Sequence, residues 1–187
     1  MPFIKLPEGL PGIVSGFAYR PETAKPMREL AEVLLRGPST LSRGERETIA
    51  AFVSTLNDCY FCRTSHRAAA AHSEDCSYQF VDAVCANYNE APISGKLKAL
   101  LAIAGKVQRG GNRVTAGDIE AARGHGATDL EIHDTVLIAA AFCMYNRYVD
   151  GLGTLTPKDE SLYDEMGASL AREGYVKTEK ELAASRS

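Results

Sequence analysis

The stretch "SRGERETIAAFVSTLNDCYFCRTSHRAAAAH" (Ser42–His72) predicts two helices joined by a short turn. It begins with a capping box, in which the Ser42 hydroxyl and the Glu45 carboxylate bind free backbone N–H groups at a helix start. A second helix is predicted from near Cys59 to about His72, through the alanine run. The buried face of the first helix is read from apolar residues at helical spacing, namely Ile49, Phe52, Val53 and Leu56.

The rest of the chain predicts further helices on both sides of this pair. An apolar stripe at helical spacing precedes it, made of Met27, Leu30, Ala31 and Leu34. After it, helices are predicted over Ser77–Asn89, Ser94–Gln108, a short segment after Thr115, a long segment from the capping box Thr128–Glu131 to Gly151, and Lys158–Arg172. Since no convincing alternating strand pattern occurs, we expect one compact all-α unit over residues 1–187 that ends in a polar tail, 173–187.

The longest helix is expected to bury a stripe that contains Leu130, Leu137, Ala140, Ala141, Met144 and Tyr148. His133 shares this stripe, and we interpret it as an interface histidine.

An internal offset suggests two related halves, about 23–92 and 94–172. Glu47 lies twelve residues before Cys59, and Glu131 lies twelve before Cys143. The same offset pairs Cys62 with Asn146 and His66 with Asp150. A duplication with a reactive first copy and a lapsed second copy would produce this pattern. The identities are few, so coincidence stays an alternative.

Composition excludes several classes of function. Apolar residues make up 45% of the 187 residues, charged residues 24%, and the net charge is −3, which is ordinary for a globular protein. The sequence has no basic stripe of the kind that would predict a nucleic-acid partner. It also has no apolar run long enough to span a membrane. The proline-interrupted N-terminus does not resemble a signal peptide, so we expect a cytoplasmic protein. In that compartment five cysteines argue against a disulfide scaffold.

The pair Cys59 and Cys62 carries the strongest chemical signal. Free N–H groups and the positive end of the helix dipole at a helix start favour thiolate at both positions. His66 lies on the same helix face, four residues after Cys62, where an imidazole can accept or return a proton. Glu47, on the preceding helix, could orient His66, although nothing local forces it to face the pair.

Two other interpretations of the pair remain. Cys59 and Cys62 could be buried structural thiols, or they could bind zinc with His66 and Cys76. No second C-x-x-C or H-x-x-x-H motif completes a closed four-ligand zinc site. Of the remaining thiols, Cys85 and Cys143 are interpreted as core residues and Cys76 as an exposed thiol.

The pattern E-x11-C-x-x-C-x-x-x-H, formed by Glu47, Cys59, Cys62 and His66, resembles the signature of the alkylhydroperoxidase D (AhpD-like) proteins. These proteins belong to the carboxymuconolactone decarboxylase superfamily. The segment "AAFCMYNRYVDGLGT" (Ala140–Thr154) is similar to the peroxidase-related branch. The resemblance runs from about Glu22 to Pro157.

This resemblance implies an all-helical AhpD-like subunit of two related halves, assembled as a trimer or hexamer. It implies a peroxidatic Cys62, a resolving Cys59 and a proton relay of His66 and Glu47. The implied partners are a hydroperoxide substrate and an external dithiol that reduces a Cys59–Cys62 disulfide; no cofactor or metal is expected. Phe61 departs from the pattern, because better-known members carry a second histidine there.

The cysteine pair argues against the lactone decarboxylation of the other branch, which lacks it. The alternative function is a non-catalytic helical oligomer whose dithiol senses redox state or binds zinc.

Overall fold

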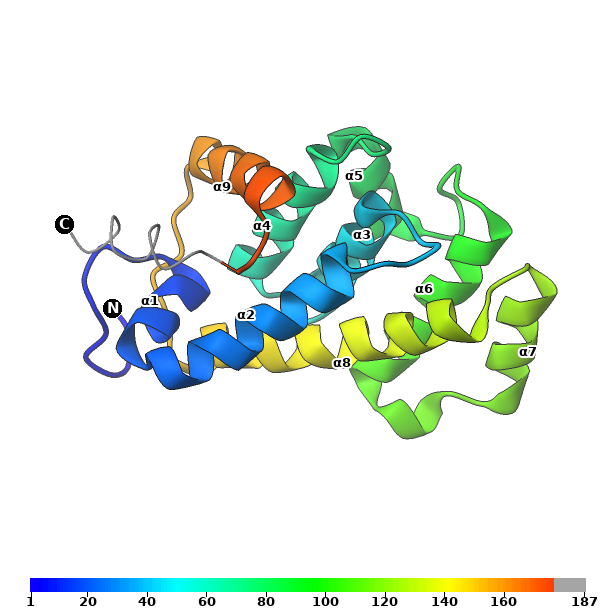
Figure 1. The fold of residues 1–187 in the computed structure, drawn as a ribbon, viewed down its shortest axis with the longest axis horizontal. Coiled ribbons are helices and arrows are strands. Elements are labelled where there is room, and N and C mark those ends of the chain that lie inside the picture. Colours follow the sequence, from blue (N-terminus) through cyan, green and yellow to red (C-terminus); the bar gives the residue numbers. More distant parts are fainter. Residues whose placement is uncertain (177–187) are drawn as a thin grey trace.

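The computed structural model describes residues 1–176, and this part of the chain is all α-helical, as predicted (Figure 1). The helices predicted with defined ends begin and end within two residues of those positions. No helix among the described residues is long and apolar enough to cross a membrane. The elements are α1 (Gly12–Tyr19), α2 (Pro21–Arg36), α3 (Arg43–Leu56), α4 (Tyr60–Ala71), α5 (Tyr78–Asn87), α6 (Gly95–Arg109), the 3-10 turn η1 (Gly111–Arg113), α7 (Ala116–Gly124), α8 (Asp129–Gly151) and α9 (Glu160–Glu173).

Both predicted capping boxes are confirmed. The Glu45 N–H donates to the Ser42 hydroxyl at 3.0 Å, and the Ser42 N–H donates to the Glu45 carboxylate at 3.0 Å. The box at the start of α8 has the same reciprocal pair between Thr128 and Glu131. Helix α1 has no counterpart among the predicted helices, because prolines interrupt the N-terminal segment; one of them, Pro11, is the residue that precedes its first turn.

The main core lies where α3, α6 and α8 pack against one another, with α2 along α8 (Figure 1). Burial of each large aliphatic side chain there contributes about 1.5–3 kcal/mol to stability. Fully buried members include Leu35, Ile49, Val53, Leu100, Ile103 and Ile138.

The prediction of which residues α8 buries was wrong in part. Leu130 and Met144 are 52% and 44% exposed, whereas Ile138 and Phe142 are fully buried. Apolar residues surround α8 on nearly all sides, so helical spacing alone does not single out one face. The buried face also carries polar residues, including Asn146, which made it a less obvious choice.

Helix α4 lies between α3 and α9 (Figure 1). The backbone of α9 approaches α4 closely at Gly167, where an added Cβ would lie 2.5 Å from the Cβ of Ala68. The alanine run of α4 and this glycine therefore allow direct contact between the two helices. The contact directs the chain after α9 toward the same side of α4 that carries His66.

Candidate active site

The dithiol lies at the start of α4, directly after the turn that follows α3. The Cys59 N–H donates to the Ser54 carbonyl at 3.0 Å, and Asp58 adopts a left-handed backbone with φ of +54°. Aspartate is one of the few non-glycine residues that tolerate this conformation. Cys59 precedes the first turn and Cys62 lies within it, so the predicted helix-start position is confirmed. Both thiols are free and buried.

The surroundings of Cys59 differ from the expectation of two activated thiols. A hydrogen bond with Cys62 and burial both raise the pKa of the Cys59 thiol well above its usual range. The thiol also lies 3.4 Å from the Asp150 carboxylate, whose negative charge disfavours a second anion. Burial in turn raises the pKa of Asp150. Cys59 is therefore a protonated thiol at neutral pH, despite the helix dipole.

The structure brings Glu47 and His66 together. Glu47 Oε2 lies 2.7 Å from His66 Nδ1, and both side chains are largely buried. A carboxylate in this position accepts the Nδ1 proton, which leaves the Nε2 lone pair of the neutral imidazole free to act as a base. The Phe142 ring packs edge-on against His66, with centroids 4.5 Å apart, and holds the imidazole plane.

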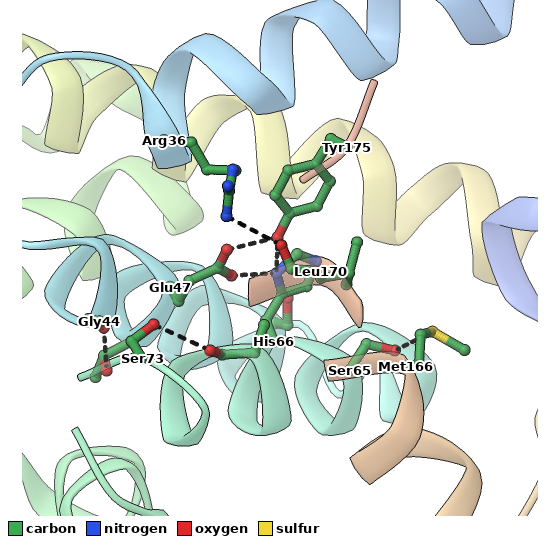
Figure 2. A network of polar contacts seen from close by, with 12 residues as sticks. Arg36, Gly44, Glu47, Ser65, His66, Ser73, Met166, Leu170 and Tyr175 are labelled. Carbon is green, nitrogen blue, oxygen red and sulfur yellow. Dashed lines mark hydrogen bonds and ion pairs between the residues drawn. The ribbon is translucent and has the colours of Figure 1, made fainter. Parts of the chain in front are cut away.

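Tyr175 completes this cluster. Its hydroxyl donates to Glu47 Oε1 at 2.6 Å and lies 3.4 Å from His66 Nδ1, while its ring stacks on the imidazole with an interplanar angle of 9°. Figure 2 shows the phenol pointing from the chain after α9 toward both side chains. Burial and the adjacent Glu47 charge raise the pKa of Tyr175 well above its usual value. Tyr175 is therefore a neutral donor to the Glu47 carboxylate.

Helix α2 holds the segment that carries Tyr175. Arg36 Nη1 donates to the carbonyls of Leu170 and Ala171 at 3.1 and 2.7 Å, near the C-terminal end of α9. Glu32, paired with Arg36 at 3.2 Å, accepts the Tyr175 N–H at 2.7 Å. These contacts satisfy free carbonyls of α9 and fix the backbone on either side of the turn.

Sequence reasoning missed Tyr175 because it falls in the segment 173–187 that was assigned to a polar tail. One local signal was available. Gly174 has φ of +86°, and a glycine that ends a helix is often followed by a residue that packs back onto the fold. Tyr175 is the lone aromatic residue after α9. Residues 177–187 lie outside the described residues.

Cys62 and His66 line a common cavity of about 330 Å³, and Cys59 does not line it. The cavity wall is mostly apolar and comes from α1, α2, α4, α8, α9 and Tyr175. Phe61 also lines it and packs edge-on against Tyr163, with centroids 5.8 Å apart. An added Cβ at Gly12, where φ is +49°, would overlap the Phe61 ring. Better-known AhpD-like proteins carry a histidine at this position. In this chain the residue there, Phe61, packs against α1 instead.

The residues that the internal offset pairs with the predicted site do not form a second site; they are Glu131, Cys143, Asn146 and Asp150. All four lie along the continuous helix α8, whereas Glu47 and the dithiol lie on separate helices that fold against each other. Nineteen residues of α-helix separate Glu131 from Asp150 by about 28 Å. Glu131 instead binds Lys96 Nζ at 2.7 Å and the Thr40 hydroxyl at 2.8 Å.

The other cysteines lie apart from this cluster. Cys76 packs against Gly44 and Asp75, and burial raises its pKa to about 12. Burial also raises the pKa of Cys85, which packs on the core. Within residues 1–176, no three His, Cys, Asp or Glu side chains are grouped in a way that could hold a metal ion.

Known proteins match this chain in sequence and structure. The model of the carboxymuconolactone decarboxylase family matches residues 21–87. An AhpD-core, uncharacterized peroxidase-related protein from Ralstonia eutropha JMP134 is 31% identical, with a TM-score of 0.74 over 85% of this chain and 82% of that chain. An uncharacterized peroxidase-related protein from Silicibacter sp. TM1040 is 28% identical, with a TM-score of 0.72 over 82% and 78%.

A protein of unknown function from Agrobacterium tumefaciens shares the fold at 22% identity, with a TM-score of 0.66 over 79% of this chain and 99% of that chain. No curated protein sequence matches the chain. The family match covers the helix pair that carries Glu47, Cys59, Cys62 and His66. The chain belongs to the carboxymuconolactone decarboxylase family, and its structural neighbours are AhpD-like peroxidase-related proteins.

Proposed function

We propose that this protein is a thiol-dependent peroxidase that reduces hydrogen peroxide or organic hydroperoxides in antioxidant defence. The observation that supports it best is the shared position of Cys62 and His66 in one cavity wall, with His66 bound to Glu47 at 2.7 Å. A thiol, a base and a group that orients the base are the parts that nucleophilic catalysis requires. The AhpD-like neighbours add support from similarity.

In the first step, His66 Nε2 takes the proton of the Cys62 thiol. The thiolate attacks the terminal oxygen of R–O–O–H, the O–O bond breaks, and Cys62 becomes a sulfenic acid. The leaving R–O⁻ receives the proton from the imidazolium and departs as R–OH. Glu47 stabilises the imidazolium during this exchange, and Tyr175 holds the carboxylate in place.

In the second step, the Cys59 sulfur attacks the Cys62 sulfenic sulfur, and a Cys59–Cys62 disulfide forms. The sulfenic hydroxyl leaves as water after it combines with the Cys59 proton. Asp150, 3.4 Å from the Cys59 sulfur, is in position to accept that proton and pass it to the sulfenic hydroxyl. An external dithiol then reduces the disulfide by thiol exchange and is itself oxidised.

Peptide mass spectrometry after one equivalent of hydroperoxide tests the proposal. We expect a peptide with a Cys59–Cys62 disulfide, and a steady loss of hydroperoxide once a dithiol such as dithiothreitol is added. Cys76, Cys85 and Cys143 serve as internal controls that stay reduced. Oxidation spread evenly over all five cysteines would contradict the proposal.

The same sample separates the alternative function. A reversible disulfide without continued hydroperoxide consumption would indicate a redox sensor. Zinc near one equivalent per chain, lost in Cys59→Ser, would indicate a metal-binding dithiol.

Replacing Tyr175 by phenylalanine should lower kcat/KM for hydroperoxide about tenfold. The change keeps the ring that stacks on His66 but removes the hydroxyl that donates to Glu47, and a hydrogen bond to a charged group contributes about 1.5–3 kcal/mol. The matched control is Tyr163→Phe, which removes a buried hydroxyl that donates to the Pro157 carbonyl at 2.9 Å. Steady-state kinetics and thermal unfolding are measured for both. Equal activities in the two variants would mean that the Tyr175 hydroxyl is not part of the proposed proton relay.

We also propose a homo-oligomer, a trimer or hexamer, as the resemblance implies. The exposed side of α8 supports it, because Leu130 and Met144 are large apolar side chains with open surface. Burial of such a face against another copy would be favourable.

A further inference from the structure

Arg28 is the one permanently charged side chain among the described residues that line the cavity. It projects from α2 and is half-buried. Its guanidinium lies over the Phe17 ring, 4.7 Å from the centroid, and Nη1 donates to the Tyr175 carbonyl at 3.2 Å. Arg28 therefore forms part of the cavity wall next to the segment that carries Tyr175.

The charge of Arg28 has no acidic partner among residues 1–176. Among the described residues, no Asp or Glu side chain forms an ion pair with it. Burial lowers its pKa, with no opposing contribution from a carboxylate. Within the described part of the chain, Nη1 is the guanidinium nitrogen that donates a hydrogen bond, so the edge formed by Nε and Nη2 has donors to spare. Two parallel N–H groups on one edge match the two oxygens of a carboxylate.

The rest of the wall is suited to an apolar molecule. Apolar side chains make up most of the cavity wall, and the cavity volume falls in the range of small-molecule sites, about 300–1,000 Å³. Contributors from four helices are Ile13, Phe17, Met27, Phe142, Met166 and Leu170. Hydrogen peroxide has no apolar part and would gain nothing from such a wall.

We propose that the cavity selects organic hydroperoxides that carry an apolar body and a carboxylate, with Arg28 binding the carboxylate. This proposal rests on the proposed peroxidase function, which it narrows to a substrate class. The carboxylate at Arg28 and the apolar body along the wall orient the molecule, so that its hydroperoxide group is presented to Cys62 and His66. A fatty-acid hydroperoxide has this chemistry.

Binding can be tested without any turnover. Calorimetry compares decanoate with 1-decanol, which share a ten-carbon chain, at concentrations below those at which decanoate forms micelles. Wild type is expected to bind decanoate about tenfold or more tightly than decanol, as a charge-assisted hydrogen bond predicts. In Arg28→Gln the two affinities should become equal, and Arg28→Lys should keep part of the difference. Equal affinities in wild type would overturn the proposal.

Turnover gives a second test. The values of kcat/KM are compared for linoleic acid hydroperoxide and its methyl ester, which differ only in the carboxylate. We expect the acid to be favoured about tenfold in wild type, and the ratio to fall to about one in Arg28→Gln. If wild type turns over the acid, the ester and hydrogen peroxide, and the acid-to-ester ratio of kcat/KM is one, the proposed substrate class is overturned. The proposed peroxidase function would still stand. Decanoate discrimination without turnover of any hydroperoxide would support the binding site and contradict the peroxidase.

Discussion

Cys62→Ser should lower hydroperoxide consumption by at least about 10³-fold, because serine cannot supply a thiolate to attack the O–O bond. Of the two buried thiols, Cys62 is the one that lines the cavity. The expected loss therefore follows from access as well as from chemistry. Initial rates are measured with cumene hydroperoxide and excess dithiothreitol. Equal rates in wild type and Cys62→Ser would contradict the proposed peroxidase function.

Cys59→Ser is the matched control, since it removes the other sulfur of the same helix turn. This variant should consume one equivalent of hydroperoxide per chain, and a sulfenic acid should persist on Cys62. A dimedone adduct on Cys62, detected by mass spectrometry, reports that species. If Cys59→Ser traps no sulfenic acid while Cys62→Ser does, the two cysteines have exchanged roles. The buried, protonated state of Cys59 favours Cys62 as the thiol that attacks the hydroperoxide.

Glu47→Gln should lower kcat/KM about 10²-fold, within the usual range for loss of a general acid–base partner. The two carboxylate oxygens accept from two different groups, Oε1 from the Tyr175 hydroxyl and Oε2 from His66 Nδ1. An amide has one oxygen and one NH₂ group, so it faces one of these donors with a donor of its own. In either orientation the negative charge that stabilises the imidazolium is lost, and where the NH₂ group faces Nδ1, His66 must change tautomer or lose this hydrogen bond.

Glu131→Gln is the control for this change, because Glu131 is also a buried glutamate and lies twelve residues before Cys143, as Glu47 lies twelve before Cys59. Burial alone would raise the pKa of Glu131, but hydrogen bonds from Lys96, the Thr128 N–H and Thr40 lower it to about 2. A depressed pKa means that the charge stabilises the fold above the unfolded value of 4.5, and that this stabilisation disappears as the pH falls toward 2.

We therefore expect Glu131→Gln to lose about 1–2 kcal/mol of stability at pH 7 and to retain full peroxidase activity. Its stability should also depend less on pH between 4.5 and 2. Denaturant unfolding at several pH values, measured beside kcat/KM, checks both. If Glu131→Gln lost activity but kept its stability, Glu131 would have a role in the reaction, and this prediction would be wrong.

The fold class and most helix ends could be predicted because they depend on local signals. The capping boxes at Ser42 and Thr128 and the glycines after α6 and α8 act within one helical turn. The buried side of α8 could not be predicted, because a helix with apolar residues all round is oriented by its neighbours. Helix α1 was missed for a related reason: its first residue, Gly12, is fixed by packing against Phe61, far along the chain.

The residues of the candidate site also fall into two groups, those that local spacing predicts and those that depend on tertiary packing. Cys62 and His66 are four residues apart on α4 and line the same cavity, as helical spacing predicts, whereas Cys59 lies outside it. Glu47 needed the packing of α3 on α4, which the motif suggested but no local rule required. Tyr175 and Arg28 depend on how α9 and α2 meet, and no spacing in the sequence connects residue 28 with residue 175.

The hydrogen bond from Tyr175 to Glu47 spans 128 positions of the chain. A ribosome makes the dithiol helix long before it makes Tyr175, so a partly synthesised chain contains both thiols but lacks the donor that holds Glu47. The order of synthesis therefore delays this hydrogen bond to Glu47 until Tyr175 has been made. Cys62 and His66 are thus made well before the side chain that donates to Glu47.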